Sequence, residues 1–498
     1  MPRTLYVSTA IPYVNAPPHL GFALEIVLAD ALARHARARG EEVHFATGTD
    51  DNSLSNVRAA EAAGVSVRAL VDTNGARYRA LDQVLHLSFD DFVRTSADPR
   101  HLEAVRAIWE SCVRAGDLER RPYRGLYCVG CEQFYEPGEL TDGVCPEHGR
   151  APEIVEEENW FFRLSRYERP LREALASGRL RIEPPERARE VEQFLAGGLR
   201  DVSVSRSRSR ARGWGIPVPG DLEQVVWVWL DALSNYVATL GYPADADRLH
   251  RFWEGADRRV HVVGKGIARF HAILWPALLL AAGLPLPTTL WVHGYVTVGG
   301  QKIGKSRGNA VDPAALVERF GADTLRYFLL RHVGARQDAD IDEGRLETVY
   351  RSELADQLGN LVSRTIALLQ RHADGRVPPA PERGLDEAGE QLIARSRNLH
   401  SEVDEAIAKL APDDAIRAIW RLVHATNKHL ADTAPWALAR DPRSRPRALA
   451  VLHHVSGALR AIGRELVPFL PGTGDAILRA IANPAEGAAI LFPKGTRE

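Results

Sequence analysis

Apolar residues recur at intervals of three and four along segment 17–40, as on one face of an α-helix. They are Leu20, Leu24, Val27, Leu28 and Ala31. This spacing predicts an amphipathic helix. Pro17 and Pro18 stand where such a helix begins, and Gly40 stands where it ends. The first turn carries the letters HLGF, whose histidine and glycine the amphipathic pattern does not require.

Two short apolar runs flank this helix and read as buried strands: TLYVSTA (4–10) and EVHFATG (42–48). A strand, a helix and a second strand in succession form a βαβ unit, which implies a parallel sheet. The same order returns at RVHVVGKG (259–266), a helical stretch over 267–283, and TLWVHGYVTVGG (289–300). We therefore predict an α/β fold, with a Rossmann-like parallel-sheet nucleotide-binding domain that an insertion divides into two halves. Ligands of such sheets bind at the carboxyl ends of the strands.

From residue 346 onward the pattern is helical throughout, with long amphipathic stretches such as ELADQLGNLVSRTIALLQRH. This part predicts a C-terminal all-α helical bundle. The Pro-rich stretch DGRVPPAPERG (374–384) is expected to be a loop within it. The predicted organisation has four parts: the first half of the nucleotide-binding domain (1–119), the insertion (120–200), the second half (201–345) and the helical domain (346–498).

The bulk composition is that of a soluble globular protein, and the net charge of −2 on 498 residues gives no overall basic signature for nucleic acid. Any contact with nucleic acid must therefore come from a local patch. The most apolar stretch, residues 271–291, contains three prolines and does not read as a membrane span. The N-terminal MPRTLYVSTA leads directly into a strand pattern without a signal peptide, so we expect a cytoplasmic protein.

Three of the four cysteines are spaced with a histidine in the order CxxC and CxxH: Cys128, Cys131, Cys145 and His148. Three thiolates and one imidazole complete a tetrahedral Zn²⁺ site, and a site with four protein ligands has a structural role. A CxxC can instead be a redox pair, but a redox motif does not supply the second pair. We therefore expect structural zinc in the insertion. Cys112 lies on a helical pattern and is expected in the core.

Two stretches carry groups suited to binding phosphate. HLGF places His19 and Gly21 at a helix start, where the backbone N–H groups and the helix dipole favour an anion. The Gly-rich stretch GGQKIGKSRGNAVDP (299–313) contains Lys302 and Lys305, two cations suited to neutralising the charge of a transferring phosphate. Each stretch alone has an ordinary explanation, a helix cap or a solvated lysine loop. Together they indicate a nucleotide site.

HLGF followed far downstream by KIGKS resembles the paired signature of class I aminoacyl-tRNA synthetases, and nearly the whole chain resembles the methionyl-tRNA synthetases of that class. The stretches that carry the resemblance are AIPYVN (10–15), ATGTDD (46–51), YCVGC with CPEH, EENWFFRLSRY (157–167), WGIPVPGD (214–221), VWVWLDALSNY (226–236), VVGKGIARFHAILWPALL (262–279) and KIGKS. The synthetases for leucine, isoleucine and valine are weaker candidates, because they carry a large editing insertion for which this chain has no room.

The resemblance implies a methionine pocket lined by Ile11, Tyr13, Trp229, Ala232, Leu233, Tyr236, Ile267, Phe270 and His271. Asp50 would accept a charge-assisted hydrogen bond from the substrate α-ammonium. The implied ATP site comprises His19, Gly21, Phe22, Gly264, Gly266, Lys302, Lys305 and Ser306, of which His19 and the two lysines would act in catalysis. Aromatic rings around a polarizable thioether agree with this assignment, although Trp229 and Tyr236 also suit an ordinary core.

The implied reaction has two steps: methionine and ATP, with Mg²⁺, form methionyl-adenylate, and the acyl group then moves to the 3′ end of tRNA(Met). In the helical domain, Asn360 and Arg364 share one helical face, and Trp436 lies in TAPWAL. These residue types read unpaired bases, and the resemblance assigns them to the CAU anticodon. An Asn–Arg pair alone is also common on a solvated face. No stretch resembles an appended tRNA-binding or dimerisation domain, so we expect a monomer.

Four positions depart from the family pattern, all on the ATP side. Phe22 replaces a second histidine, Gly266 replaces an acid that holds the ribose 2′-hydroxyl, DDNS (50–53) replaces DEHG, and KIGKS replaces KMSKS. Loss of one phosphate-binding imidazole removes a transition-state donor worth on the order of 3 kcal/mol. We therefore predict a slow or re-tuned methionine–tRNA ligase. The alternatives are a non-catalytic synthetase-like protein that binds tRNA or nucleotide, and an adenylate-forming enzyme of specialised metabolism.

Overall fold

The computed structural model describes residues 2–147, 149–303, 309–380, 387–488 and 490–493. The chain forms two compact units. The first comprises Met1–Ala29, Ala36–Asp82 and Ser88–Gly294, and the second comprises Asp30–His35, Gln83–Leu87 and Tyr295–Glu498. The four segments expected from the sequence are a finer, functional division, and they stay a prediction.

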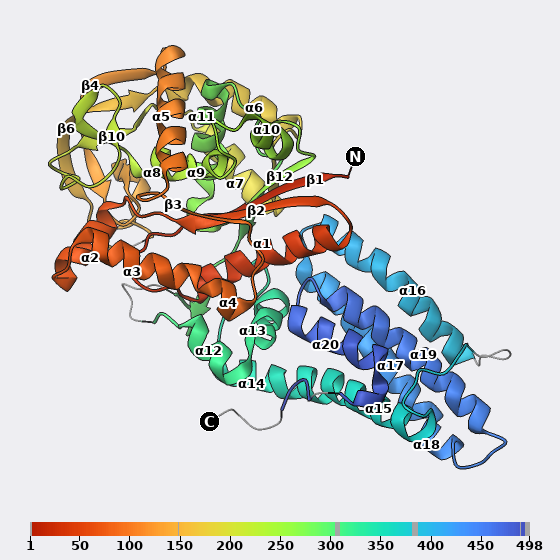
Figure 1. Ribbon diagram of the computed structural model, residues 1–498. Coiled ribbons are helices and arrows are strands. Elements are labelled where there is room, and N and C mark those ends of the chain that lie inside the picture. Colours follow the sequence, from red (N-terminus) through yellow and green to blue (C-terminus); the bar gives the residue numbers. More distant parts are fainter. Residues whose placement is uncertain (1, 148, 304–308, 381–386, 489, 494–498) are drawn as a thin grey trace. The chain divides into compact units, whose positions relative to one another are not determined.

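A six-stranded sheet forms the centre of the first unit (Figure 1). In spatial order its strands are β3 (Asp91–Arg94), β2 (Glu42–Thr49), β1 (Thr4–Thr9), β12 (Arg258–Gly264), β13 (Thr289–His293) and β7 (Arg181–Glu183). Every neighbouring pair is parallel. Because β12 lies directly beside β1, segments from both ends of this unit build one sheet, as the split α/β prediction requires.

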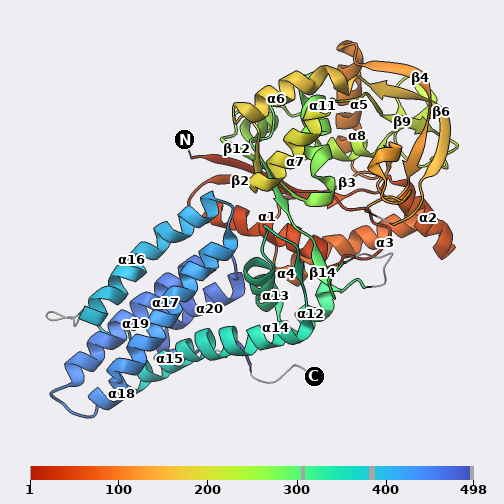
Figure 2. The ribbon, with the colours of Figure 1, turned by 180° about the vertical axis from the view of Figure 1, so that it is seen from behind.

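Helices cover both faces of the sheet (Figures 1 and 2). On one face lie α1 (Leu20–Ala38) and α3 (Val67–Arg79), and on the other lie α5 (Pro99–Arg114) and α11 (Trp275–Ala282). The apolar positions that predicted the first helix are buried, so that helix is confirmed. The other helices up to residue 294 are α2 (Leu54–Ala63), α4 (Leu81–Leu85), α6 (Glu168–Ala176), α7 (Pro185–Ala196), α8 (Val228–Leu233), α9 (Asn235–Ala238) and α10 (Ala246–Leu249).

Two predicted elements are divided in the structure. The strand expected over 289–300 is two strands, because β13 ends at His293 and β14 (Val296–Val298) joins a different sheet. The helix expected over 267–283 contains a π-helical turn at Phe270–Leu274 before α11 begins. Apolar periodicity did not reveal either division, since a π-helical turn shifts the hydrogen-bond partner by a single residue.

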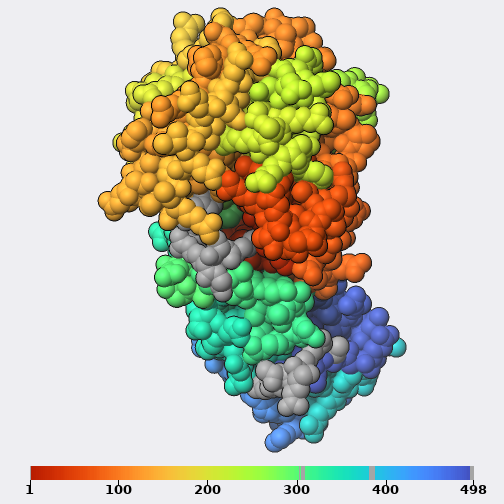
Figure 3. All heavy atoms as spheres, turned by 90° about the vertical axis from the view of Figure 1, so that its left-hand side faces the viewer, coloured from red at the N-terminus to blue at the C-terminus, as the bar shows by residue number. Residues whose placement is uncertain are grey.

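The insertion and the residues that flank it form a four-stranded antiparallel sheet of β5 (Gln133–Tyr135), β4 (Leu118–Cys128), β6 (Glu153–Phe162) and β8 (Val202–Ser203), in that order. A smaller sheet follows, with the order β10 (Pro217–Val218), β11 (Asp221–Val226) and β9 (Ser205–Ser207). In Figure 3 this region, coloured orange to yellow-green, forms a continuous surface of the first unit. The turn between β4 and β5 carries Cys131 and Glu132.

The second unit is mainly helical. Its helices are α12 (Pro313–Phe320), α13 (Ala322–Phe328), α14 (Glu343–Val349), α15 (Asn360–His372), α16 (Glu387–Ala408), α17 (Pro412–Thr433), α18 (Pro435–Leu438), α19 (Arg445–Leu466) and α20 (Pro471–Ala482). The long helices α16, α17 and α19 lie side by side (Figure 2). A π-helical stretch, Tyr350–Gly359, joins α14 to α15. Within the described ranges, no helix has the length and apolar character needed to cross a bilayer.

Candidate active site

The carboxyl ends of β1 and β2 bring two predicted site segments together. The backbone of Tyr13 pairs in parallel with that of Asp50, and the Asp50 N–H donates to the carbonyl of Pro12 at 2.9 Å. Ile11 and Tyr13 therefore lie beside the end of β2. This is the edge of a parallel sheet at which ligands bind.

An aromatic cluster is built by α8, α9 and the segment that follows β12. The Trp229 ring stacks on Phe270 with centroids 3.7 Å apart and planes 11° apart. The Tyr236 hydroxyl lies 2.6 Å from His271 Nε2, and His271 Nδ1 lies 3.0 Å from the carbonyl oxygen of Ile267. Ala232 and Leu233 are buried on α8 between the two aromatic positions. The structure thus brings together most of the side chains predicted to line a methionine pocket.

The His271 ring is neutral at physiological pH, because burial lowers its pKa to about 4. Its Nδ1–H donates to the Ile267 carbonyl, so Nε2 accepts from the Tyr236 hydroxyl. Both polar groups at this point of the cluster are thereby satisfied. At this point the cluster presents aromatic faces and uncharged polar groups, which suits an apolar, polarizable side chain.

Asp50 is buried, and its burial, together with a neighbouring acid, sets its electrostatics. Burial, and then the Asp231 carboxylate, raise the pKa of Asp50 well above its usual range. Asp231 accepts from Asn52 Nδ2 at 2.8 Å and contacts His101 Nε2 at 2.5 Å. The Asn52 bond ties the loop after β2 to α8. Sequence reasoning missed Asp231 and His101, for which the only local signal was a charged residue inside an apolar run.

His19 precedes α1 and is held by the helix it introduces. The Gly21 N–H donates to His19 Nδ1 at 3.0 Å, so the ring proton resides on Nε2, which can donate to a phosphate oxygen. A Cβ on Gly21 would lie 2.8 Å from His19 Cε1, closer than two carbon atoms approach. Glycine at this position therefore permits the imidazole orientation that the predicted role requires.

Phe22 packs its ring into the interior of the first unit. Its ring is buried and meets Tyr78 edge to face, with centroids 5.3 Å apart. The Phe22 ring itself carries no hydrogen-bond donor for a nucleotide. The departure from the family pattern at this position is therefore accommodated by packing.

The structure also reveals a buried Glu25–His293 pair near the predicted ATP-site glycines. Glu25 Oε2 lies 2.9 Å from His293 Nε2, and burial raises the pKa of Glu25. A Cβ on Gly264 would lie 3.6 Å from His293 Cε1, so Gly264 adjoins this pair. Gly266 lies just beyond, in the 3₁₀ turn Lys265–Ile267. Sequence reasoning missed Glu25, whose signal was one acid in the apolar stretch LGFALEIVL.

The KIGKS stretch begins in a tight hairpin of the second unit. β14 pairs with β15 (Gln301–Lys302), and Gly299 and Gly300 connect them with φ of 60° and 73°. Positive φ at both central residues is the requirement of a type I′ hairpin turn, which glycine meets without strain. Asp340 accepts from the Gly300 N–H at 2.9 Å and fixes the turn. Lys305 and Ser306 lie outside the described residues, and so does the side chain of Lys302.

The three cysteines of the insertion converge on one point. The sulfur atoms of Cys128, Cys131 and Cys145 all lie within 4.8 Å of one another, and none is in a disulfide. Three such sulfurs are the donor set that zinc prefers, and Cys128 and Cys145 are buried. The predicted fourth ligand, His148, lies outside the described residues. Cys112 is fully buried, as expected of a core cysteine.

In the helical unit, Arg364 of α15 lies over the Trp436 ring of α18, 5.3 Å from its centroid. Asn360 is exposed one turn earlier on α15, and Trp436 is half-buried. Ala434, with φ of 41°, turns the chain immediately before α18. The structure thus gathers an amide, a guanidinium and an indole, groups that can stack on and hydrogen-bond to unpaired bases.

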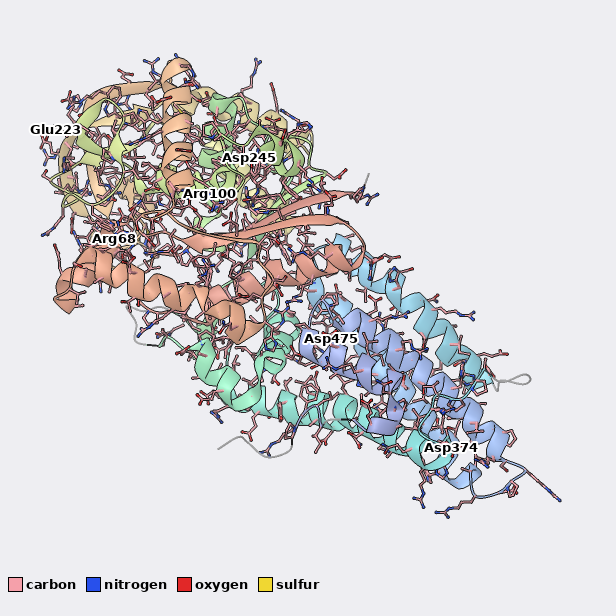
Figure 4. All side chains as sticks on the ribbon, viewed as in Figure 1. Arg68, Arg100, Glu223, Asp245, Asp374 and Asp475 are labelled. Carbon is pink, nitrogen blue, oxygen red and sulfur yellow. The ribbon has the colours of Figure 1, made fainter. Side chains whose placement is uncertain are left out.

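A shallow pocket of about 540 Å³ opens at another place in the first unit. It is lined by Arg100, Glu103, Gly241, Ala244, Asp245, Ala246, Asp247 and Arg248. Figure 4 labels Arg100 and Asp245, which face this pocket from α5 and from the segment before α10. Its lining residues are not the predicted site residues, so the candidate active site is defined by the strand ends and not by this pocket.

Comparisons with known proteins agree with these features. The family described as "tRNA synthetases class I (M)" matches residues 5–151 and 130–366. The methionine–tRNA ligase of Caldanaerobacter subterraneus subsp. tengcongensis is 41% identical over 474 residues, which cover 95% of this chain and 73% of that protein. The methionine–tRNA ligase of Brucella suis is 38% identical over 486 residues, which cover 97% of this chain and 92% of that protein.

The fold also matches a solved structure along its whole length. The Mycobacterium tuberculosis methionyl-tRNA synthetase in complex with methionyl-adenylate is 36% identical and has a TM-score of 0.91. The match covers 99% of this chain and 99% of that chain. The likeness therefore includes the sheet, the insertion and the helical unit.

Proposed function

The chain belongs to the methionyl-tRNA synthetases of class I and is a methionine–tRNA ligase, and from this premise we propose how its own residues carry out the reaction. The enzyme joins methionine to tRNA at the expense of ATP, by way of methionyl-adenylate. Class I synthetases need no protein nucleophile for this chemistry, so the side chains act by positioning the substrates and by stabilising charge.

Methionine would be held by the aromatic cluster at one end and by Asp50 at the other. Trp229, Phe270 and Tyr236, with His271, Ile267, Ala232, Leu233, Ile11 and Tyr13, form the proposed site for the thioether side chain. Asp50 would accept from the α-ammonium, which stabilises its ionised form. The observation that carries the proposal is the Asn52–Asp231 hydrogen bond of 2.8 Å, because it ties the loop of Asp50 to the helix of Trp229.

In the activation step, a carboxylate oxygen of methionine bonds to the α-phosphorus of ATP. The bond from that phosphorus to the bridging oxygen of the β-phosphate breaks, and pyrophosphate leaves. We propose that His19 donates from Nε2 to a phosphate oxygen as negative charge develops there, supported by the tautomer that Gly21 fixes. The acyl group then passes to the 3′ end of tRNA(Met), and AMP leaves.

The remaining ATP contacts follow from the family motifs. We propose that Lys302, Lys305 and Ser306 bind phosphate oxygens, and that the backbone at Gly21, Gly264 and Gly266 lies along the nucleotide. Phe22 adjoins this site but offers it no hydrogen bond, since its ring packs on Tyr78. This supports a turnover that is reduced and not abolished. Mg²⁺ would enter with ATP as part of the substrate.

We propose that Cys128, Cys131 and Cys145, with His148 as the fourth ligand, hold a structural zinc ion. The converging sulfurs fit such an ion. When bound, the metal would cross-link the turn after β4 to the segment that carries Cys145. It supplies stability to the insertion, and no step of the reaction passes through it.

For the helical unit, we propose that Asn360, Arg364 and Trp436 read the CAU anticodon of tRNA(Met). The Arg364–Trp436 contact supports this, because a guanidinium over an indole presents a ready-made stacking platform. We also propose that the enzyme works as a monomer in the cytoplasm, where ATP and tRNA are available. Its functional segments would be 1–119 and 201–345 for catalysis, 120–200 for the zinc insertion and 346–498 for the anticodon.

Exchange of pyrophosphate into ATP, measured with a panel of amino acids, tests the activation step. Methionine is expected to support exchange, and leucine, isoleucine, valine and cysteine are not. Charging of tRNA(Met) transcripts tests the transfer step separately. Exchange at background with methionine, in an enzyme that still binds tRNA(Met), would overturn the proposed activity and leave a binding protein.

Phe22→His tests the predicted cause of slow turnover. If the new imidazole turns from Tyr78 toward the phosphates, as the prediction requires, the exchange rate is expected to rise by up to ~10²-fold, since a positioned donor is worth on the order of 3 kcal/mol. The aromatic contact with Tyr78 is lost, so a modest fall in thermal stability accompanies the gain. Phe22→Leu, which loses the ring without adding a donor, is the matched control and is expected to show no gain.

A further inference from the structure

Glu132 is a fully buried acid in the turn between β4 and β5, next to the metal-binding Cys131. Its Oε1 accepts from the Leu54 N–H at 2.6 Å, at the start of α2. Its Oε2 pairs with Arg206 Nη1 at 2.8 Å and accepts from the Tyr127 hydroxyl. Both carboxylate oxygens are thus bound by groups from three separate segments of the first unit, none of which the proposed mechanism uses.

The backbone of the same turn holds two indoles. The Trp229 Nε1–H donates to the carbonyl of Cys131 at 3.0 Å, and the Trp227 Nε1–H donates to the carbonyl of Glu132 at 2.6 Å. Trp229 is the ring that stacks on Phe270 in the proposed methionine site. The orientation of that ring is therefore set by a carbonyl in the turn that Glu132 anchors.

Glu132 adopts a left-handed conformation, with φ of 57°, which a residue with a side chain rarely takes. The contacts of its carboxylate hold the backbone there. The carbonyls of residues 131 and 132 accept the indole hydrogen bonds with the backbone in this conformation, so the side-chain anchor and the indole hydrogen bonds are parts of one arrangement.

A second wall of the pocket lies close to the same charges. Burial raises the pKa of Tyr13, and the nearby Glu132 and Asp50 carboxylates raise it further, whereas Arg206 opposes the shift. The Glu132–Arg206 pair is buried on both sides, with side chains 0% and 5% exposed. Removal of one partner would leave the other charge unpaired in the interior, beside the pocket.

We propose that Glu132 is a positioning residue for methionine recognition: it fixes the turn whose carbonyls orient Trp229, and it thereby couples the metal-binding turn to the amino-acid pocket. This rests on the proposed function of the aromatic cluster. Glu132 is not among the proposed substrate contacts, so it acts on methionine affinity only through the orientation of Trp229. Its loss is expected to leave ATP affinity unchanged. Zinc bound at Cys131 would hold the same turn from its other side.

Glu132→Gln tests the proposal, because the amide keeps the shape and removes the charge. The expected result is a rise of about tenfold in the KM for methionine in the exchange assay and in the methionine Kd by calorimetry. The KM for ATP and the zinc content per chain are expected to stay within twofold of wild type. Glu136→Gln, an exposed acid of the same hairpin paired with Arg200, is the matched control and is expected to change neither constant.

If Glu132→Gln does not fold, a less disruptive variant tests the same proposal. Tyr127→Phe removes one donor to the Glu132 carboxylate and is expected to raise the methionine Kd a few-fold at an unchanged KM for ATP. Combined with Trp229→Phe, which removes the indole donor to the turn, it is expected to add little to the loss from Trp229→Phe alone, since both act on one ring orientation.

Other outcomes would overturn the proposal. An unchanged methionine Kd in both variants, or equal losses for methionine and ATP, would mean that Glu132 serves stability only. A fully additive double variant would mean that the turn and the indole are independent. Failure of the wild-type enzyme to exchange with methionine would instead count against the proposed function, so the two ideas fail by different results.

Discussion

The substitution Gly21→Ala is expected to lower kcat without lowering the stability of the protein. The new Cβ would lie 2.8 Å from His19 Cε1 and 3.0 Å from His19 Nδ1, so the imidazole must swing away. A ring on a flexible side chain moves at little cost to the fold. Alanine also favours a helix over glycine by about 0.5–1 kcal/mol, so the variant is expected to be as stable as wild type or slightly more stable.

The same substitution is expected to slow catalysis. The displaced ring loses the Gly21 N–H bond to Nδ1, which fixes the proton on Nε2, and with it the proposed donor to the phosphate. Loss of such a donor lowers kcat by about 10²–10³-fold, on the order of 3–4 kcal/mol in the barrier. Methionine binding does not involve this turn, so the methionine Kd is expected to be unchanged.

The assay combines pyrophosphate exchange, methionine calorimetry and thermal unfolding on Gly21→Ala, His19→Ala and the double variant. If both single changes act on one imidazole, the double variant is expected to be no slower than His19→Ala alone. The reasoning is refuted if Gly21→Ala keeps wild-type kcat, or if it slows the His19→Ala enzyme by a further factor. A large fall in the unfolding midpoint would show that the new Cβ disturbs the fold and not only the ring.

Three further outcomes are expected. At a pH below the pKa of free Asp50, methionine binding is expected to release a proton, because burial and Asp231 raise that pKa and the substrate ammonium lowers it. Affinity therefore rises with pH up to the free pKa and then levels, and equal binding enthalpies in phosphate and Tris buffers would contradict this. Arg364→Ala and Trp436→Ala are each expected to lower tRNA charging by about 5–150-fold, the cost of one lost stacking contact, with exchange unchanged; a fall in both would indicate a folding defect. Cys145→Ser is expected to lose bound metal, measured by elemental analysis, together with thermal stability, and full metal retention would show that Cys145 is not a ligand.

The pattern of apolar residues along the chain predicted much of the fold. Apolar runs located β1, β2 and β12, and the three-and-four spacing located α1, because these elements bury one face or both against the core. The HLGF stretch was also informative on its own, since the hydrogen bond from Gly21 to His19 joins residues two apart in the chain. The CxxC spacing likewise places two sulfurs in one turn, and only the approach of Cys145 needed the fold.

The buried polar pairs could not be read from the sequence. His101 meets Asp231 across 130 residues, and Glu25 meets His293 across 268. Each acid interrupts an apolar run. The sequence of such a run is the same whether the carboxylate faces water, a substrate or a distant histidine, so the sequence does not identify the partner of the acid. Only packing decides which partner arrives, because a buried carboxyl is tolerated when a donor reaches it.

The sequence alone therefore determined the elements, the family and the residue types available for chemistry, since these depend on neighbours within a few turns of the chain. The tertiary structure decided their use. It turned the Phe22 ring inward onto Tyr78, and it tied the loop of Asp50 to α8. It also joined the metal-binding turn to Trp229 through Glu132. These arrangements bring together groups that are remote in sequence. The polar ones are selected because a buried polar group without a partner costs free energy.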